Sequence, residues 1–283
     1  MKEQTIYVIA GPTASGKSSL ALALAKKING QIVNADASQV YQGLRILSAR
    51  PDEKEEAQCP HYLYGYADSQ TQVNMADWLM RAKEIIPTLS CPIVVGGTGL
   101  YLNALIKGIS QIPEIPEEIR SFVRQMPDEE RKQRLKEVGC PVDPQRQKRV
   151  LEVLLTTGKT MEYFQKLGNK KVIQGDFKTI LLQPFREEVY QNCAKRLEIM
   201  LAQGAIQEVE SLLKSGASGG VLKAIGVPEL TRYLKNEISL LQAKELILLA
   251  TRHYAKRQRT WFRHQFPALW TLDRPELEKV ITL

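Results

Sequence analysis

One segment near the start of the chain constrains the fold more than any other feature. Residues 11–18 read Gly-Pro-Thr-Ala-Ser-Gly-Lys-Ser and follow the apolar run from Ile6 to Ala10. In this pattern the glycines let the backbone curl, so that successive N–H groups converge on an anion. Lys17 adds a positive charge, and the Ser18 hydroxyl can hold Mg²⁺. A helix beginning here would direct its dipole at the same anion. The segment therefore predicts a site for a di- or triphosphate, without specifying which bond breaks.

The composition is that of a soluble globular protein. The chain has 283 residues, of which 43% are hydrophobic and 25% charged, which suits one large domain with an inserted part. It contains no run of about 18 apolar residues, the length that a membrane-spanning helix needs. The first residues do not resemble a signal peptide. The four cysteines are far apart and form no Cys-x-x-Cys pair. We therefore expect a cytoplasmic protein with free thiols, no zinc site and no membrane association.

Positive charge is concentrated toward the end of the chain. The formal net charge is +8, which favours a polyanionic partner such as nucleic acid, although net charge alone does not require one. Residues 246–272 contain no Asp or Glu. In a helix over this region, basic residues at i, i+4, i+7 and i+11 form one positive face. These residues are Arg252, Lys256, Arg259 and Arg263.

The first part of the chain alternates short apolar segments with helical ones. Strands predicted at residues 6–10, 31–35 and 91–95 are separated by helix-forming sequence. This alternation indicates a parallel sheet covered by helices, hence an α/β fold with a P-loop NTPase-like core. Ligands of such sheets bind at the carboxyl ends of the strands. The phosphate-binding loop, Asp36 and Thr98 all follow such ends, so we expect them to line one crevice.

The pattern changes near residue 113, where two prolines mark a boundary. The sequence from there to about residue 171 is charged and helical in period, without a convincing strand. Residues 177–182 resemble a returning core strand, and long helical segments follow. We predict a catalytic core formed by residues 1–112 and 176–283, with a small all-helical insertion at residues 113–175.

Several polar residues near the predicted strand ends are open to two interpretations. Asp36 is placed to accept a proton from an attacking group, or it caps the segment that follows. Gln39 and Tyr41 offer contacts to a base or hydroxyl, or they fill a turn. The glycine-rich segment around Thr98 allows a ligand to approach the backbone, or it forms a tight turn.

The insertion contains a second candidate surface. Asp143 and Pro144 are typical of a helix start, and Gln145, Arg146 and Arg149 would cluster on one side of that helix. Such a cluster is either a ligand surface or a solvated basic face.

Taken in order, these motifs resemble the tRNA dimethylallyltransferases, also called tRNA isopentenyltransferases. The resemblance extends through nearly the whole chain and is specific because many motifs occur in sequence. The matching segments are Gly11–Ser18, Asn34–Asp36, Gln39–Gly43, Pro60-His61, Gly96–Tyr101, Asp143–Arg146, Arg149, Leu151–Val153, Thr157–Thr160 and Ala255–Arg263.

The resemblance implies a reaction. A dimethylallyl group would pass from dimethylallyl diphosphate to N6 of adenine-37, next to the tRNA anticodon, with release of diphosphate. The phosphate-binding loop would hold the diphosphate with Mg²⁺, and the adenine would be flipped into a channel. Asp36 matches the general base of the family, Thr98 the threonine at the reaction channel, and Arg196 the arginine that stabilises the leaving charge.

The resemblance also implies the binding residues and a monomeric enzyme. The diphosphate-binding residues are Gly11, Pro12, Thr13, Ala14, Ser15, Gly16, Lys17 and Ser18, of which Ser18 holds the metal. The tRNA-binding residues are Asp36, Ala37, Ser38, Gln39, Thr98, Arg120, Gln145, Arg146, Gln147, Lys148, Arg149, Lys223, Gly226, Lys256, Arg257, Gln258, Arg259 and Arg263.

Some positions depart from the family pattern. Ala37 stands where a serine is usual, Leu47 where a glycine is usual, and Asn192 replaces the first arginine of a pair, leaving Arg196 alone. The insertion is also shorter than usual, so we expect a smaller grip on the anticodon stem.

Two alternatives remain at this point. A small-molecule kinase would bind ATP on the same loop and use Asp36 to activate a hydroxyl. A catalytically idle RNA-binding module would follow if the departures marked decay. The acid-free basic segment and the ordered motifs beyond Tyr101 favour the transferase.

Overall fold

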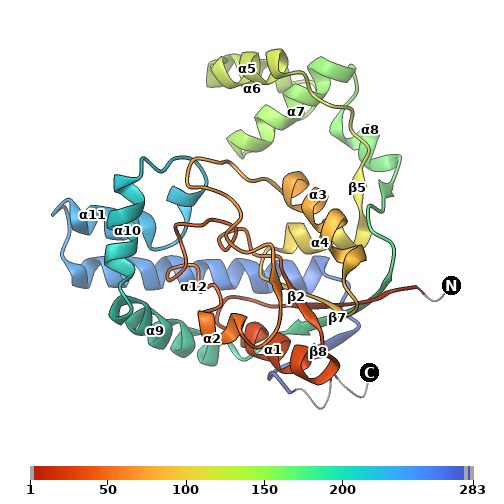
Figure 1. Ribbon diagram of the computed structural model, residues 1–283. Helices are drawn as coiled ribbons and strands as arrows, with labels where there is room; N and C mark the ends of the chain where they lie inside the picture. The colour runs from red at the N-terminus through yellow and green to blue at the C-terminus, as the bar shows by residue number, and fades with distance from the viewer. Residues whose placement is uncertain (1–2, 277–279, 281–283) are drawn as a thin grey trace. The chain divides into compact units, whose positions relative to one another are not determined.

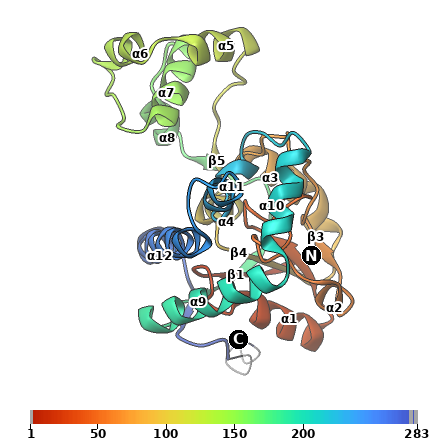
Figure 2. The same ribbon diagram turned by 90° about the vertical axis from the view of Figure 1, so that its left-hand side faces the viewer.

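The computed structural model describes residues 3–276 and residue 280, and the chain divides into two compact units (Figures 1 and 2). The larger unit comprises residues 1–106 and 173–283, and the smaller one residues 107–172. The sequence predicted the inserted unit at 113–175. The observed limits are earlier because two short strands at its base, β5 (Ile109–Ser110) and β6 (Asn169–Lys170), pair with each other in antiparallel orientation. Only β6 lies within the insertion predicted at 113–175, and it contradicts the expectation that this insertion is all-helical; it has only two residues and no apolar run.

The larger unit is built on a six-stranded sheet in the order β3-β2-β4-β1-β7-β8, in which all neighbours are parallel. The four strands predicted from the sequence are confirmed. Their apolar runs suit strands that are covered on both faces of the sheet. Two edge strands, β3 and β8, were not predicted. The strands are β1 (Thr5–Ala10), β2 (Gln31–Asn34), β3 (His61–Tyr62), β4 (Pro92–Gly96), β7 (Asp176–Leu182) and β8 (Trp270–Leu272).

Helices surround this sheet. Helix α1 packs on β1, β2 and β4, while α12 contacts both α9 and α11, and α10 contacts α9 and α11. No helix of the described residues is long and apolar enough to cross a membrane. The helices are α1 (Lys17–Ile28), α2 (Glu53–Glu56), α3 (Met75–Ile85), α4 (Gly99–Lys107), α9 (Arg186–Ala202), α10 (Ala205–Lys214), α11 (Val227–Leu234) and α12 (Leu240–Gln265), with single 3₁₀ turns at Ile86–Thr88 and Val221–Lys223.

Two cores hold these layers together. The first joins the sheet to α1 and includes Ile9, Leu24 and Ile93. The second joins the helices to the segment after β2, through residues such as Leu44 and Ile247. The carboxyl end of the sheet therefore lies between a rigid sheet core and a helical core, which is where a parallel sheet places its ligand.

The smaller unit has four helices besides its two short strands. Three of these helices share an apolar core that includes Val123, Leu135 and Leu151, and the fourth packs through Phe164 on a second cluster with Val153. Helix α7 starts as the sequence predicts: the Asp143 side chain accepts a hydrogen bond from the Arg146 backbone N–H, and proline occupies the first turn. The helices are α5 (Glu117–Gln125), α6 (Asp128–Leu135), α7 (Pro144–Thr157) and α8 (Met161–Lys166).

Candidate functional site

A cavity of about 470 Å³ in the larger unit brings together residues that are distant in the sequence. Cationic and polar residues line part of it, including Lys17, Asp36 and Arg196. Apolar side chains from α9 and α12, among them Met200 and Ile247, line another part. A cavity of this size with a few convergent polar groups is typical of a ligand site.

The phosphate-binding loop connects β1 to α1, and its backbone is shaped for an anion. Ala14 and Gly16 both have positive φ, 58° and 86°, which turns the loop back on itself. In the described part of the chain no side chain caps the amino terminus of α1 at Gly16. The first N–H groups of the helix are therefore available to an anion. The buried Ser15 hydroxyl, which has no protein partner among the described residues, is a further polar group in this loop.

Lys17 is the cation of the loop, and its Nζ lies 3.3 Å from the carbonyl oxygen of Pro12. Burial lowers the pKa of Lys17 to about 8, an effect that Asp36 opposes and Arg196 reinforces. The ammonium group is thus partly desolvated before a ligand arrives, which strengthens its attraction for a phosphate.

This pKa predicts a pH-dependent affinity for the diphosphate. The charged lysine binds the anion, so the charge and the affinity decline as pH rises through about 8. We expect the dissociation constant of an unreactive thiolodiphosphate analogue, measured by calorimetry, to increase by up to ~10-fold per pH unit above that value. Lys17→Arg keeps its charge and should show no such dependence. Equal slopes for the two proteins between pH 7 and 9.5 would contradict the assignment.

Asp36 follows β2 and is held by its neighbours in a turn. Its Oδ1 accepts hydrogen bonds from the Ser38 N–H, at 3.0 Å, and the Ser38 hydroxyl, at 2.7 Å. The buried Asn34 side chain accepts from the Asp36 N–H at 2.8 Å and donates to the Asp36 carbonyl at 3.1 Å. No helix follows directly, so Asp36 stabilises a turn rather than a helix start. Ala37 has no hydroxyl, and the hydroxyl that contacts Asp36 is that of Ser38.

Thr98 is fixed beside Asp36. Its hydroxyl oxygen accepts from the Ala37 N–H at 2.9 Å, and its side chain hydrogen-bonds the hydroxyl of Tyr254 on α12. Tyr254 lines the cavity, although no motif in the sequence points to it. Its position three residues after the buried Thr251 would have placed it near the inner face of the helix.

Arg196 reaches the phosphate-binding loop from α9. Its Nη2 donates to the Thr13 hydroxyl at 2.5 Å, and burial lowers the pKa of its guanidinium, which remains charged at neutral pH. One turn earlier, the Asn192 amide donates to the Ala14 carbonyl at 3.3 Å. Asn192 thus replaces a family arginine with a neutral contact to the same loop.

The predicted tRNA residues of the larger unit fall into two groups. Ala37, Ser38, Gln39, Lys223 and Arg257 line the cavity, and Lys256 and Arg263 are exposed on α12. Gly226, Gln258 and the half-buried Arg259 instead contact other parts of the protein. Gly226, with φ of 97°, packs against Leu47; Arg259 donates to the Pro184 carbonyl; and Gln258 is buried against the phosphate-binding loop.

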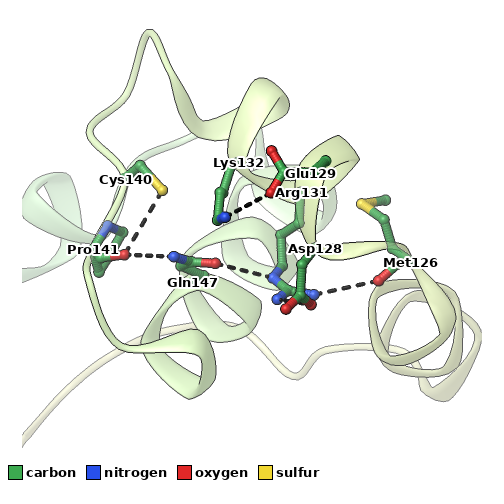
Figure 3. Close-up of polar contacts among 8 residues, drawn as sticks. All are labelled: Met126, Asp128, Glu129, Arg131, Lys132, Cys140, Pro141 and Gln147. Atoms are coloured by element: carbon green, nitrogen blue, oxygen red, sulfur yellow. Dashed lines mark hydrogen bonds and ion pairs between the residues drawn. The ribbon is translucent and has the colours of Figure 1, made fainter.

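The predicted tRNA residues of the smaller unit are also divided. Arg120, Gln145 and Arg146 are exposed, whereas Lys148 and Arg149 are half-buried. Gln147 is only 4% exposed. Figure 3 shows its side chain turned toward α6, where its Oε1 accepts from the Arg131 Nε at 3.3 Å and its Nε2 donates to the Pro141 carbonyl at 2.7 Å.

Arg131 is the centre of this polar cluster. It is 1% exposed and also donates to the Met126 carbonyl, at 3.3 Å, and to the Asp128 carboxylate, at 2.5 Å (Figure 3). Gln147 therefore links α7 to α6. It stabilises the position of the helix that carries the exposed tRNA candidates, and its own side chain does not face solvent.

We expect Gln147→Leu to destabilise the smaller unit by about 1–3 kcal/mol, because it leaves the buried Nε of Arg131 without a partner. The measurement is amide hydrogen exchange of α6 and α7 in the full chain. Gln145→Leu, at an exposed position of the same helix, is the control and should change stability by less than about 0.5 kcal/mol. Unchanged exchange in Gln147→Leu together with weaker tRNA binding would indicate a direct RNA contact.

Comparison with known proteins identifies the family. A family model described as IPP transferase matches residues 39–265, and one described as isopentenyl transferase matches residues 4–66. The chain belongs to the IPP transferase family. Its α/β fold with a six-stranded parallel sheet and additional helices is the fold of that family, and the sequence predicted the α/β class and the parallel sheet.

Other IPP transferases resemble this chain over nearly its full length. A tRNA dimethylallyltransferase of Bartonella henselae is 41% identical and the alignment covers 96% of this chain and 99% of that protein. One from Azorhizobium caulinodans is 42% identical, with 95% and 92% covered. A tRNA delta(2)-isopentenylpyrophosphate transferase from Staphylococcus epidermidis superimposes with a TM-score of 0.73 at 30% identity, covering 99% and 97% of the two chains. A eukaryotic dimethylallyltransferase solved while acting on tRNA gives a TM-score of 0.78 at 27% identity, covering 92% of this chain and 70% of that one.

Proposed function

We propose that this IPP transferase moves a dimethylallyl group from dimethylallyl diphosphate to N6 of adenine-37, beside the anticodon of tRNA, and releases diphosphate. The observation that supports this most directly is the single cavity in which Lys17, Arg196 and Asp36 meet apolar side chains. The cations suit the diphosphate and the apolar side chains suit a hydrocarbon group. The tRNA dimethylallyltransferases among its relatives support the choice of substrates.

Asp36 is the proposed general base. As N6 of adenine attacks C1 of the dimethylallyl group, the N6–C1 bond forms, the bond from C1 to the diphosphate oxygen breaks, and Asp36 accepts a proton from N6. Ser38 occupies Oδ1, so Oδ2 is the oxygen proposed to take the proton. Thr98 holds the adjacent Ala37 backbone in place.

The charge that develops on the leaving diphosphate is stabilised by groups already in position. These are the Lys17 ammonium, the Arg196 guanidinium and the N–H groups at the start of α1. Because the three are fixed before the reaction, stabilising the new charge needs little reorganisation.

Mg²⁺ is the proposed cofactor. Ser18 is exposed at the start of α1, and one hydroxyl together with diphosphate oxygens and water suits the coordination that Mg²⁺ adopts with phosphate substrates. When bound, the ion would neutralise charge on the diphosphate. Lys17 and Arg196 hold and orient the remaining oxygens.

The tRNA is proposed to bind to basic surfaces of both units. In the larger unit, Lys223 and Arg257 border the cavity and Lys256 and Arg263 extend the positive surface along α12. In the smaller unit the exposed candidates are Arg120, Gln145 and Arg146. We further propose that the enzyme acts as a monomer in the cytoplasm.

The test is direct transfer of a label. The full chain is incubated with unmodified tRNA, Mg²⁺ and labelled dimethylallyl diphosphate, and label should appear on the RNA. The matched control is the same tRNA with guanosine at position 37, which should remain unlabelled. ATP turnover without RNA labelling would instead support a kinase, and RNA binding without either activity would support a binding module.

A further inference from the structure

Gln258 connects the two loops that flank Asp36. Its side chain is 6% exposed, on the inner face of α12. Its Oε1 accepts from the Thr13 N–H in the phosphate-binding loop at 2.8 Å, and its Nε2 donates to the Gly97 carbonyl at 2.9 Å. Thr13 and Gly97 are more than eighty positions apart in the sequence, and the side-chain amide of Gln258 binds both.

An amide suits this place. One partner is a backbone N–H and the other a backbone carbonyl, so the bridging side chain has to accept at one atom and donate at the other. The two backbone groups also fix which atom of the amide is oxygen and which is nitrogen. Since both are buried, loss of either bond leaves an unpaired polar group.

The glycines around Thr98 make room for α12. A Cβ at Gly97 would lie 2.4 Å from the Gln258 Nε2, and one at Gly99 would lie 2.2 Å from the Trp261 ring. Gln258 and Trp261 are three residues apart, on neighbouring positions of the helix surface. The sequence of this glycine-rich segment indicated ligand approach or a tight turn. In the structure its glycines allow side chains of α12 to contact the backbone directly.

We infer that Gln258 is a positioning residue that fixes the phosphate-binding loop relative to the Thr98 segment. Thr13 is held twice, by Gln258 at its N–H and by Arg196 at its hydroxyl. Gly97 directly precedes Thr98, whose hydroxyl holds the backbone beside Asp36.

The inference rests on the proposed function, in which the phosphate-binding loop holds the diphosphate of the donor and the Thr98 segment holds the backbone beside the general base. A displacement of about 1 Å between reacting groups can lower a rate by about 100-fold. Gln258 is therefore expected to affect the chemical step more than the binding of either substrate.

The test compares Gln258→Met, which keeps the side-chain length but removes both hydrogen bonds, with Gln207→Met at an exposed position of α10. We expect kcat at saturating substrates to fall about 10- to 100-fold in Gln258→Met. The dissociation constants of tRNA and of a thiolodiphosphate analogue should change less than about threefold. Gln207→Met should behave as the unmodified protein.

A second pair of variants keeps the test informative if Gln258→Met folds poorly. A Cβ at Gly97 would lie 2.4 Å from the Gln258 Nε2 and 3.3 Å from the Asp36 Oδ2, so Gly97→Ala alone should lower kcat at least as much as Gln258→Met does. In Gln258→Ala the closer of these two contacts is absent, so adding Gly97→Ala should lower kcat by a smaller factor than it does in the unmodified protein. Non-additive effects of the two substitutions on kcat would show that residues 97 and 258 act through their mutual contact.

Two results would overturn the inference. Weaker tRNA binding with unchanged kcat would make Gln258 an RNA contact, and a lower melting temperature with both kcat and binding unchanged would make it only structural. Failure of the proposed base is distinguishable: Asp36→Asn would then keep its activity, whatever Gln258→Met does.

Discussion

Asp36→Asn should lower kcat by a factor of about 10² to 10⁴, the usual contribution of a general base. Asparagine has nearly the same shape and can still accept from the Ser38 N–H and hydroxyl through its amide oxygen. The turn should therefore persist, and only the ability to take a proton from N6 is lost. The measurement is single-turnover transfer of labelled dimethylallyl to tRNA, with tRNA binding measured separately.

Asp68→Asn is a matched control for this change. Asp68 is exposed and also accepts from backbone N–H groups two and three residues later, of Gln70 and Thr71. It resembles Asp36 in local geometry but does not line the cavity. Its substitution should leave transfer unchanged. If Asp36→Asn kept more than about a tenth of the activity, proton transfer to this carboxylate would not be a major part of the barrier.

The parts of the fold that the sequence predicted are those set by local patterns. Continuous apolar runs specify β1, β2, β4 and β7, because each run is buried on both faces of the sheet. The edge strands β3 and β8 form only because a neighbouring strand offers unpaired backbone groups, as Ile180 does for Trp270. A strand of only two or three residues is too short to show this pairing as a sequence pattern.

The same dependence on local patterns explains which site residues the sequence predicted correctly. Lys17, Asp36 and Thr98 were found because each lies next to a strand end, where the sequence alone fixes its place. Gln258 and Gln147 were assigned to RNA because they match segments that contact tRNA in the family that the sequence resembles. Each is buried instead, since its partner comes from a distant segment: the Thr13 N–H in one case and Arg131 in the other.

Arg196→Met should lower kcat by about 10²- to 10³-fold, the effect typical of removing one group that stabilises a developing charge. The methionine fills part of the space but leaves the diphosphate with one cation fewer, and it releases the Thr13 hydroxyl. Arg196→Lys should recover only part of the rate, because an ammonium group lacks the planar set of donors that can contact Thr13 and the diphosphate together.

The distribution of the effect between binding and rate distinguishes the possible roles of Arg196. If it stabilises mainly the leaving diphosphate, kcat falls more than the affinity for the thiolodiphosphate analogue. If it binds ground state and transition state equally, KM rises while kcat is preserved. Arg186→Met provides the control, since Arg186 starts the same helix with a side chain 65% exposed. An unchanged kcat in Arg196→Met would remove this guanidinium from the stabilisation of the leaving group and leave Lys17 as the principal cation.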